Sequence, residues 1–437
     1  MKVSIIIVNH NGSMHLPELF KSFKALEYPE EQFEVIFFDN GSVDNSLEVV
    51  RREYSRARII SNPDNLGFAA PHRIAAAKAR GEILAFLNND MRVDPRWITE
   101  GISYLNPEQK IVCSSSKIFT WDGKNIDFGG GSLQYLGYAE QYQKDEIKDG
   151  APVLFPCGGA MFISRKVFLE ADCFDDDYFA VFEDVDLGWR LWMMGYKVVM
   201  ASRSIVYHKG HATLDSRGEV RKRYLMHKNA LVTIIKNYQE DNLKKILPSA
   251  MSLALKRALL FLGVDKRMFY FWEKDRGRLT LNKNSIEGLI HLVVLDDVFE
   301  NFENIREKRD RVQAKRVRKD EEILSMFKDP LRNIMGFKEY FWHEASLIGY
   351  FQLYELFNCT EQYRNNLNHG LGIARHDLNR IRREINRNTL TIPCINKPSG
   401  RFRDLIDKFN HRRKSEGILN AFRYSLFFYI EKVRRKN

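Results

Sequence analysis

The chain is 437 residues long, more than one hydrophobic core usually supports, so at least two domains are expected. Its 44% hydrophobic and 29% charged residues are typical of a globular protein and argue against a disordered or fibrous chain. The net charge of +11 divides unevenly, with net −6 on residues 1–210 and net +17 on residues 211–437. The basic half suits nucleic acid, anionic lipid or a polyanionic substrate, whereas the acidic half argues against nucleic acid as the main ligand.

The cysteines and the N-terminus bear on the cellular compartment. The five cysteines are widely spaced and form no CxxC pair, which argues against a disulfide scaffold or a zinc knuckle and indicates a reducing, cytoplasmic compartment: Cys113, Cys157, Cys173, Cys359 and Cys394. The apolar run that opens the chain is too short for a signal-peptide core. No segment approaches the ~18–20 apolar residues of a membrane span, so we expect at most peripheral membrane attachment.

The first 90 residues alternate between apolar runs and segments with helical spacing. Strands are predicted at 3–11, 33–42, 57–63 and 82–90, and helices at 16–26, 46–54 and 68–80. This alternation predicts an α/β fold with a mostly parallel sheet covered by helices, and ligands at the carboxyl ends of the strands.

The rest of the chain is predicted to be less uniform. Residues 111–165 look irregular and glycine-rich, and a short helix, a helix that ends before Gly195 and two short strands are expected to follow. We therefore predict an α/β domain over residues 1–215, a basic amphipathic helical region over 216–330 and a helical extension over 331–437.

A polar cluster ends the fourth predicted strand. Asn88, Asn89 and Asp90 follow the buried run of EILAFLNND, and burying them unpaired would cost several kcal/mol each. They either cap the helix that DPRWITEGI begins or hold a polar ligand. Asp94 before Pro95 already suits the capping role, so ligand binding is favoured.

A divalent cation is one such ligand. A carboxylate and an imidazole that leave positions open for phosphate oxygens make a workable Mg²⁺ or Mn²⁺ site. His208, on a late predicted strand, is the candidate second ligand beside Asp90, and His211 competes for that role.

Three acidic residues, Glu183, Asp184 and Asp186, begin a predicted helix. Acids at this position complement the helix dipole and cap free amides, which is one explanation. However, Asp184 and Asp186 face different directions, so one can cap while another points into a cleft as a general base. Neighbouring aromatic residues would supply walls that raise a carboxylate pKa: Tyr178, Phe179, Phe182 and Trp189.

Six segments in order resemble glycosyltransferase family 2, an inverting class with the GT-A fold. They are SIIIVNHNG, VIFFDNGSVDNS, NPDNLGFA, ARGEILAFLNND, PCGGAMFISRKVF and FDDDYFAVFEDVDLGWRLWMMGYKVVMASRSIVYHKG. Together they span roughly residues 1–215 and are most similar to the bacterial branch that acts on cell-surface polysaccharides, including rhamnosyltransferases.

The resemblance implies a role for each matching residue. Val8 and Asn9 would line the nucleotide pocket, Asp39 would accept a hydrogen bond from the base, and Asn65 and Gly67 would lie near the nucleotide-sugar.

The NND cluster occupies the place of the family's DxD motif. Asn88, with Asn89 beside it, would face the ribose or sugar, and Asp90 and His208 would hold the metal. Asp184 would be the catalytic base with Glu183 beside it.

The acceptor side would be formed by Gly158 and Gly159, with Asp186 and Trp189 nearby. One departure from the family is Pro71-His72-Arg73 after the NLGFA segment, where Arg73 could itself contact the phosphates.

The implied reaction is inverting transfer of a sugar from a nucleoside-diphosphate-sugar to a glycan or lipid-linked acceptor. A glycoside hydrolase and a non-catalytic carbohydrate binder are the alternatives.

The basic half suggests peripheral contact with the inner face of the plasma membrane through residues 246–263 and the last apolar helix. Packing of these segments on the catalytic domain, or dimerisation, is the other explanation.

Overall fold

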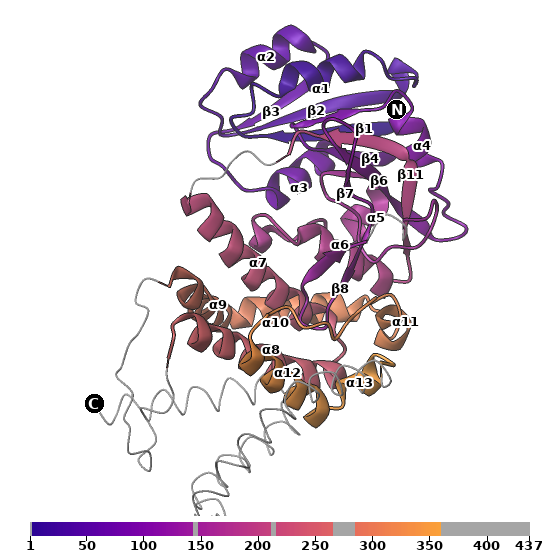
Figure 1. The fold of residues 1–437 in the computed structure, drawn as a ribbon. Helices are drawn as coiled ribbons and strands as arrows, with labels where there is room; N and C mark the ends of the chain where they lie inside the picture. The colour runs from indigo at the N-terminus through magenta and orange to yellow at the C-terminus, as the bar shows by residue number, and fades with distance from the viewer. Residues whose placement is uncertain (1, 143–146, 211–215, 265–284, 360–437) are drawn as a thin grey trace, which may run out of the picture.

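The computed structural model describes residues 2–142, 147–210, 216–264 and 285–359. A sheet with helices packed on it forms one part, and a layer of helices lies beneath it (Figure 1). The strands are β1 (Val3–Asn9), β2 (Phe33–Asn40), β3 (Arg58–Asn62), β4 (Ile83–Leu87), β5 (Met91–Val93), β6 (Ile111–Thr120), β7 (Ile126–Phe128), β8 (Gly131–Leu133), β9 (Ala139–Gln141), β10 (Ala160–Ser164) and β11 (Lys197–His208). The helices of the first part are α1 (Leu16–Phe23), α2 (Ser46–Glu53), α3 (Ala69–Lys78), α4 (Trp97–Ile102), α5 (Arg165–Glu170) and α6 (Glu183–Met193).

The main sheet has the strand order β3-β2-β1-β4-β10-β6-β11-β5, with β7 paired to β6. Strands β3, β2, β1 and β4 are parallel, and so are β6 and β11. Strand β10 is antiparallel to both of its neighbours, β4 and β6, and therefore joins the two parallel halves. The predicted α/β class with a mostly parallel sheet is confirmed.

The prediction for residues 111–165 was wrong, because β6 to β10 lie within this range. Three serines in the middle of β6 hide the apolar pattern of a strand. All three are fully buried, and their hydroxyls are hydrogen-bonded, as Ser114 Oγ is to the Gly101 carbonyl at 2.6 Å. The two strands expected after Gly195 are one strand, β11, whose register shifts between Ala201 and Ile205.

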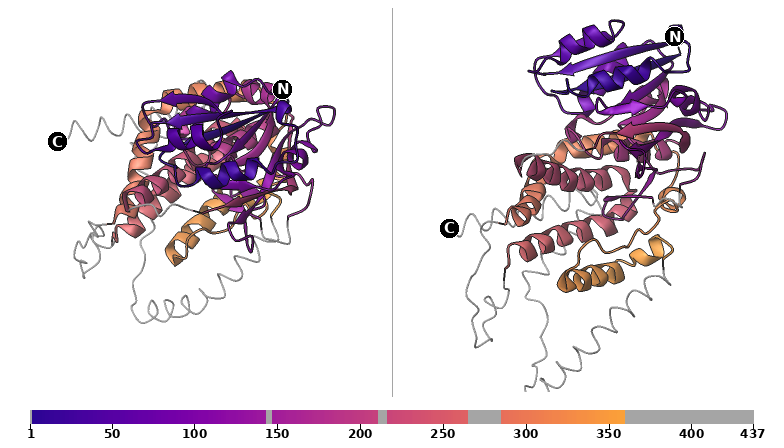
Figure 2. Two further views of the ribbon diagram at one scale, coloured as in Figure 1. Left: turned by 90° about the horizontal axis from the view of Figure 1, so that it is seen from above. Right: turned by 45° about the horizontal axis from the view of Figure 1, so that its top comes forward.

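A helical part follows, as predicted. It contains α7 (Ser216–Asn237), α8 (Glu240–Phe261), α9 (Ile286–Glu300), α10 (Phe302–Ala314), α11 (Asp320–Leu324), α12 (Lys338–Tyr350) and α13 (Leu353–Leu356). In the right view of Figure 2 these helices lie below the sheet-containing part. The predicted apolar helix near the C-terminus lies outside the described residues, and the domain boundaries at 215 and 330 stay predictions.

A buried ion-pair network joins α7 to α6. The Lys236 ammonium on α7 lies 2.6 Å from Asp175 and 3.0 Å from Asp186, and the Arg190 guanidinium lies 2.8 Å from Asp186. Burial alone would raise the pKa of Asp186, but the charges of Arg190 and Lys236 outweigh burial and hold that pKa below its usual value. These ion pairs therefore fix the helical part to the start of α6. Removing one of the charges would leave another buried without its partner and destabilise the fold.

Most apolar residues of α8 are internal. Leu243, Ile246, Leu247, Leu253 and Ala254 are all buried, with α7, α9 and α12 as the neighbouring helices. Of the helices that the structure describes, none carries an apolar stretch long enough to cross a bilayer. For residues 246–263, packing within the protein thus accounts for most of the apolar surface.

Replacing Lys236 with methionine is expected to destabilise the fold by roughly 3–5 kcal/mol, because two buried carboxylates lose a shared partner. Urea unfolding measures the change. The matched control is Lys244→Met, whose ion pair with the 91% exposed Asp241 side chain should contribute less than about 1 kcal/mol. Equal, small losses in both variants would contradict a structural role for the buried network.

Candidate active site

The carboxyl ends of β1, β2 and β4 carry amides that bind one another. Asn9 Nδ2 donates to Ser42 Oγ at 3.1 Å, and Asn89 Nδ2 donates to Asn9 Oδ1 at 2.7 Å. Gly12 lies against these amides, because a Cβ there would come within 2.2 Å of Asn89 Nδ2. The hydrogen bond between Asn89 and Asn9 thus fixes the positions of both side chains in the wall of the site.

Asp39 stands beside Asn9 in the sheet register and is only 4% exposed. Its Oδ1 atom accepts no hydrogen bond from the residues that the structure describes. Val8, one residue before the end of β1, is partly buried. A buried, unpartnered carboxylate oxygen is costly unless a ligand supplies the donor, so Asp39 fits a hydrogen-bonding role toward a bound group.

The loop after β3 is held by Asn40. Its Nδ2 donates to Asn65 Oδ1 at 3.0 Å and to the Gly67 carbonyl at 2.8 Å, and its Oδ1 accepts from Leu66 N–H. Gly67 has φ +80°, and a Cβ there would lie 2.4 Å from the Phe179 carbonyl oxygen. Glycine at 67 therefore lets this loop approach the segment before α6.

Asp90 just before β5, His208 at the end of β11 and Asp127 in β7 form a line of hydrogen bonds. His208 Nε2 lies 3.1 Å from Asp90 Oδ2, and His208 Nδ1 lies 2.6 Å from Asp127 Oδ2. Hydrogen bonds to Asp127 and then Asp90 raise the pKa of His208 to about 9. Asp90 Oδ1 is buried and has no hydrogen-bond partner in the described part of the chain.

These atoms fit a divalent cation. Two neighbouring ligands of an octahedral ion, each at about 2.1 Å, lie about 3 Å apart. Asp90 Oδ2 and His208 Nε2 have that separation, 3.1 Å. A carboxylate on the second nitrogen of a ligating histidine, as Asp127 provides, fixes the orientation of the ring.

Basic groups surround the same point. Lys209 N–H donates to the Asp90 carbonyl at 3.0 Å. The buried Nδ1 of His15, just before α1, has no hydrogen-bond partner among the described residues. Burial lowers the pKa of His15, and the charges of Asp90, Lys209 and His208 all act on its ring. An anionic ligand beside Asp90 would therefore lie near the unpartnered His15 ring and the charge of Lys209.

Two glycines connect Asp90 to the start of α6. Asn88 N–H donates to the Gly159 carbonyl at 2.9 Å, and Gly158 N–H donates to Asp184 Oδ2 at 2.8 Å. A Cβ at 159 would come within 2.7 Å of the Asn88 amide, and a Cβ at 158 within 3.2 Å of Asp184 Cβ. The structure thus brings Asn88, Gly158, Gly159 and Asp184 together at one edge of the sheet.

Glu183 and Asp184 differ in their surroundings. Burial raises the pKa of both, and the neighbouring Asp184 charge raises that of Glu183 further. Asp184 accepts backbone hydrogen bonds from Gly158 and Val185, which favour its ionised form, whereas Glu183 Oε2 finds no partner among the residues described. Asp184 is therefore the acid of the pair that ionises more readily.

The backbone before these acids is strained. Phe179, Val181 and Phe182 have φ of +59°, +69° and +74°, in the left-handed region that disfavours bulky and β-branched residues. Asn229 of α7 stabilises this segment by donating to the carbonyls of Tyr178, Ala180 and Val181. The helical part therefore helps to hold the start of α6.

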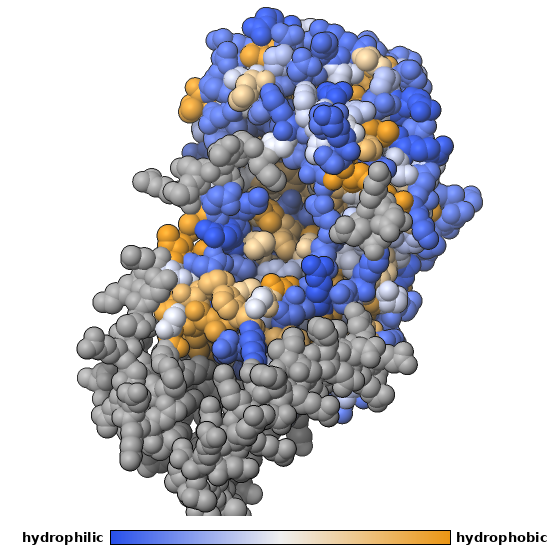
Figure 3. Space-filling model, viewed as in Figure 1, coloured by the Kyte–Doolittle hydropathy of each residue, from blue (hydrophilic) through white to orange (hydrophobic). Residues whose placement is uncertain are grey.

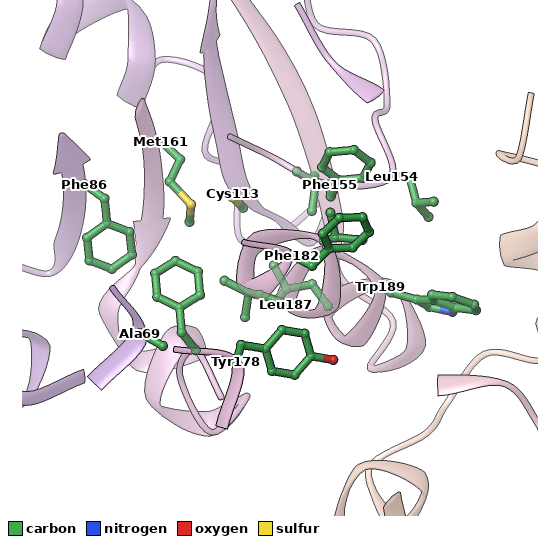
Figure 4. Packing of buried hydrophobic residues seen from close by; sticks show 14 of the residues in the cluster. Ala69, Phe86, Cys113, Leu154, Phe155, Met161, Tyr178, Phe182, Leu187 and Trp189 are labelled. Atoms are coloured by element: carbon green, nitrogen blue, oxygen red, sulfur yellow. The ribbon is translucent and has the colours of Figure 1, made fainter. Parts of the chain in front are cut away.

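Three predicted site residues lie elsewhere. Asp186 and Trp189 are fully buried, and Trp189 points away from the β10 side of the cluster in Figure 4, packing on Tyr238 and Phe327. Their predicted acceptor-side role is corrected, because neither side chain reaches solvent. Arg73 forms a bidentate ion pair with Asp176, and its phosphate contact stays a prediction.

Sequence reasoning missed four contributors: Asn40, Asp127, His15 and Asn229. Asn40 follows Asp39 directly, so the Asp-Asn-Gly turn was a usable signal. Asp127 lies in the range taken as irregular, and His15 and Asn229 carry no motif. Asp127 contacts His208 across 81 positions and Asn229 contacts Tyr178 and Val181 across 51 and 48, separations that sequence spacing cannot reveal.

The family comparison agrees with this geometry. A profile described as glycosyl transferase family 2 matches residues 4–171, and one described as glycosyl transferase family group 2 matches residues 131–272. The N-terminal part of the chain belongs to glycosyltransferase family 2. The second match extends from this family 2 region into α8, across the predicted boundary at residue 215.

Individual glycosyltransferases are similar over parts of the chain. Glycosyltransferase AglE of Haloferax volcanii is 26% identical over 30% of this chain and 40% of its own length. The N-acetylglucosaminyl-diphospho-decaprenol L-rhamnosyltransferase of Mycobacterium tuberculosis is 24% identical over 48% of this chain and 76% of its own length. This chain thus spans less than half of the archaeal relative.

A crystal structure of GalNAc-T7 with UDP, GalNAc and Mn²⁺ aligns with a TM-score of 0.47 and 17% identity, over 58% of this chain and 51% of that one.

The His208 ring of the metal-free family 2 domain is expected to stay protonated up to about pH 9, because Asp127 and Asp90 accept from it. Since its pKa lies above the ordinary 6.5, these bonds stabilise the fold fully below pH 6.5 and lose their effect as the pH rises through about 9. NMR of histidine-labelled protein checks this.

Asp127→Asn should lower the His208 pKa to below about 8, because the strongest acceptor loses its charge. The control Asp122→Asn changes an exposed acid in the turn between β6 and β7 and should leave His208 unchanged. A pKa near 6.5 for His208 in the wild-type protein would contradict its hydrogen bonds to Asp127 and Asp90.

Proposed function

We propose that the protein is an inverting, metal-dependent glycosyltransferase that moves a sugar from a nucleoside-diphosphate-sugar to a hydroxyl of a glycan or lipid-linked glycan. The observation that carries this proposal is the connection of Asp90 and His208 to Asp184 through Gly158 and Gly159. Membership of the N-terminal region in a glycosyltransferase family favours transfer over glycoside hydrolysis or simple carbohydrate binding.

The donor would occupy the carboxyl ends of β1, β2 and β4. Asp39 Oδ1 is available to accept a hydrogen bond from the base, and the loop with Asn65 and Gly67, fixed by Asn40, would border the nucleotide-sugar. Val8 and Asn9 would form the floor of this pocket, with Asn88 and Asn89 toward the ribose or sugar. Ligands of open α/β sheets bind at this edge.

Asp90 and His208 would hold Mn²⁺ or Mg²⁺, with Asp127 fixing the imidazole. When bound, such an ion supplies positive charge next to the leaving diphosphate. His15 and Lys209 would add donors on the same side, where negative charge develops as the bond to the anomeric carbon breaks. The metal ligands and these donors act on the leaving group alone.

Asp184 would act as the general base. Its ionised carboxylate, partly exposed and oriented by two backbone N–H groups, takes the proton of the acceptor hydroxyl as that oxygen bonds to the anomeric carbon. The bond to the diphosphate oxygen breaks on the opposite face, so the configuration inverts and no covalent intermediate forms. Burial, and then the charge of Asp184, raise the pKa of Glu183, which makes it the less suitable base.

The acceptor would lie on the Gly158 and Gly159 side of the cleft. The mycobacterial relative is named for transfer to a sugar carried on diphospho-decaprenol. We extend that acceptor class, a lipid-linked glycan used in cell-surface polysaccharide synthesis, to this protein as part of the proposal.

Asp184→Asn is expected to lower kcat by about 10²–10⁴-fold, because the amide cannot accept the proton. Glu183→Gln is the matched control, since it makes the same change from acid to amide one residue away, and it should keep kcat within about tenfold. The kcat of each variant is measured from the release of nucleoside diphosphate. The donor is chosen beforehand by thermal shift across a panel of nucleoside diphosphates. A larger loss in Glu183→Gln than in Asp184→Asn would contradict the assignment of the base.

We further propose that α9 supplies the contact with an anionic membrane on the inner face of the plasma membrane. Ile286, Leu289 and Val293 recur along one side of α9, and all three are exposed, as are Leu292 and, on α8, Leu255. Figure 3 shows apolar surface gathered where Figure 1 labels α9. An exposed apolar strip beside a chain half with net charge +17 is typical of interfacial binding.

The double variant Leu289→Ser, Val293→Ser should lower co-sedimentation with anionic vesicles by about tenfold, because two side chains no longer enter the lipid boundary. Val43→Ser is the control, because Val43 is 91% exposed on the sheet-containing part. Equal sedimentation of the two proteins would rule out this surface, and a change of oligomeric state in the double variant alone would indicate a dimer contact instead.

A further inference from the structure

A second group of potential metal ligands lies in the helical part, away from the sheet edge. His227 of α7 and Glu287 and His291 of α9 each offer one ligand atom, and these atoms all lie within 4.8 Å of one another. The proposed sugar transfer uses none of the three residues. Their convergence therefore needs its own explanation.

Helix geometry brings the three side chains together. Glu287 and His291 are four residues apart, so they share one face of α9. His227 reaches that face from α7, with its Nε2 3.5 Å from Glu287 Oε1 and its ring centroid 4.3 Å from that of His291. This face differs from the exposed strip that contains Leu289 and Val293.

Two of the ligand atoms are buried and unsatisfied. His227 Nε2 and His291 Nε2 have no hydrogen-bond partner within the described ranges, and His291 is 1% exposed. Two such nitrogens beside one carboxylate are unusual, because buried polar atoms are nearly always paired. A bound cation would satisfy both nitrogens at once.

The surroundings of His227 and His291 favour both rings as metal ligands. The Tyr138 hydroxyl lies 2.7 Å from His227 Nδ1, which directs the other nitrogen toward the cluster. Burial, and then the charge of Arg257, lower the pKa of His227 to about 3 and that of His291 to about 2. Both rings are therefore neutral near pH 7, and the neutral imidazole is the form that binds metals.

We propose that His227, Glu287 and His291 bind one divalent transition-metal ion, best matched by zinc. Two imidazole nitrogens and one carboxylate oxygen are a common zinc set, with water in the fourth position. Tetrahedral ligands lie about 3.3 Å apart, so the atoms must close in slightly. The Glu287 side chain, 23% exposed, can make this movement and gives the ion a route in.

Two arginines limit the affinity of this site. Arg223 lies 3.1 Å from Glu287 Oε2, and the charge of Arg257 acts on both histidines. The ion must therefore compete with Arg223 for the carboxylate. A bound ion would cross-link α7 to α9. It would thereby fix α7, the helix that carries Asn229, to the rest of the helical part.

The experiment uses the full chain without a histidine tag, equilibrated with Zn²⁺, freed of loosely bound ion and measured for zinc content. We expect one zinc per chain that survives His208→Ala, so that the sheet-edge site is excluded as its source. Glu287→Gln and His291→Ala should each reduce that zinc by at least fivefold. The control His343→Ala, on a histidine bound to Ser252, should keep it.

Co²⁺ substitution gives a second readout that does not depend on enzyme activity. Strong visible bands of a tetrahedral Co²⁺ site are expected in the wild-type chain and should be lost in Glu287→Gln, which keeps the helix fold because its side chain is partly exposed. Zinc should also raise the wild-type Tm and leave that of Glu287→Gln unchanged. A wild-type chain without zinc, or equal zinc in Glu287→Gln and His343→Ala, would overturn the proposal.

Discussion

The backbone of Gly158 and Gly159 joins the two acidic parts of the candidate active site. One glycine donates to Asp184, and the other accepts from Asn88, two residues before Asp90. These contacts exist because β10 is antiparallel to β4, which places the start of β10 beside the end of β4. A side chain at 159 would collide with the Asn88 amide and one at 158 would crowd Asp184, so the spacing of the proposed donor and acceptor sides depends on this pair.

The helical part completes the site from the other direction. The segment before Asp184 has a backbone that bulky residues disfavour, and Asn229 of α7 holds it through three carbonyls. Lys236 of the same helix pairs with Asp175 and Asp186 on either side of that segment. Strain at the start of α6 is thus balanced by contacts from α7, so residues beyond 215 are part of the site's structure.

The sequence predicted the parts of this structure that local patterns determine. The apolar runs before Asn9, Asp39 and Asp90 predicted three adjacent parallel strands, and the carboxyl ends of such strands must share an edge. Long-range packing determined the rest. Asp186 and Asp184 lie two residues apart in one acidic stretch. Yet Asp186 forms ion pairs with Lys236 and Arg190, whereas Asp184 accepts a hydrogen bond from Gly158. Asp127 joins His208 across 81 residues, and its own strand is only three residues long, too short for an alternating pattern to reveal it.

The most direct test is a crystal structure of the full chain with a nucleoside diphosphate and Mn²⁺, using the anomalous signal of manganese. We predict a manganese peak within about 2.3 Å of both an Asp90 carboxylate oxygen and His208 Nε2, with the diphosphate beside it. Nucleotide bound at another surface, or a sheet edge without manganese while the nucleotide is present, would contradict it.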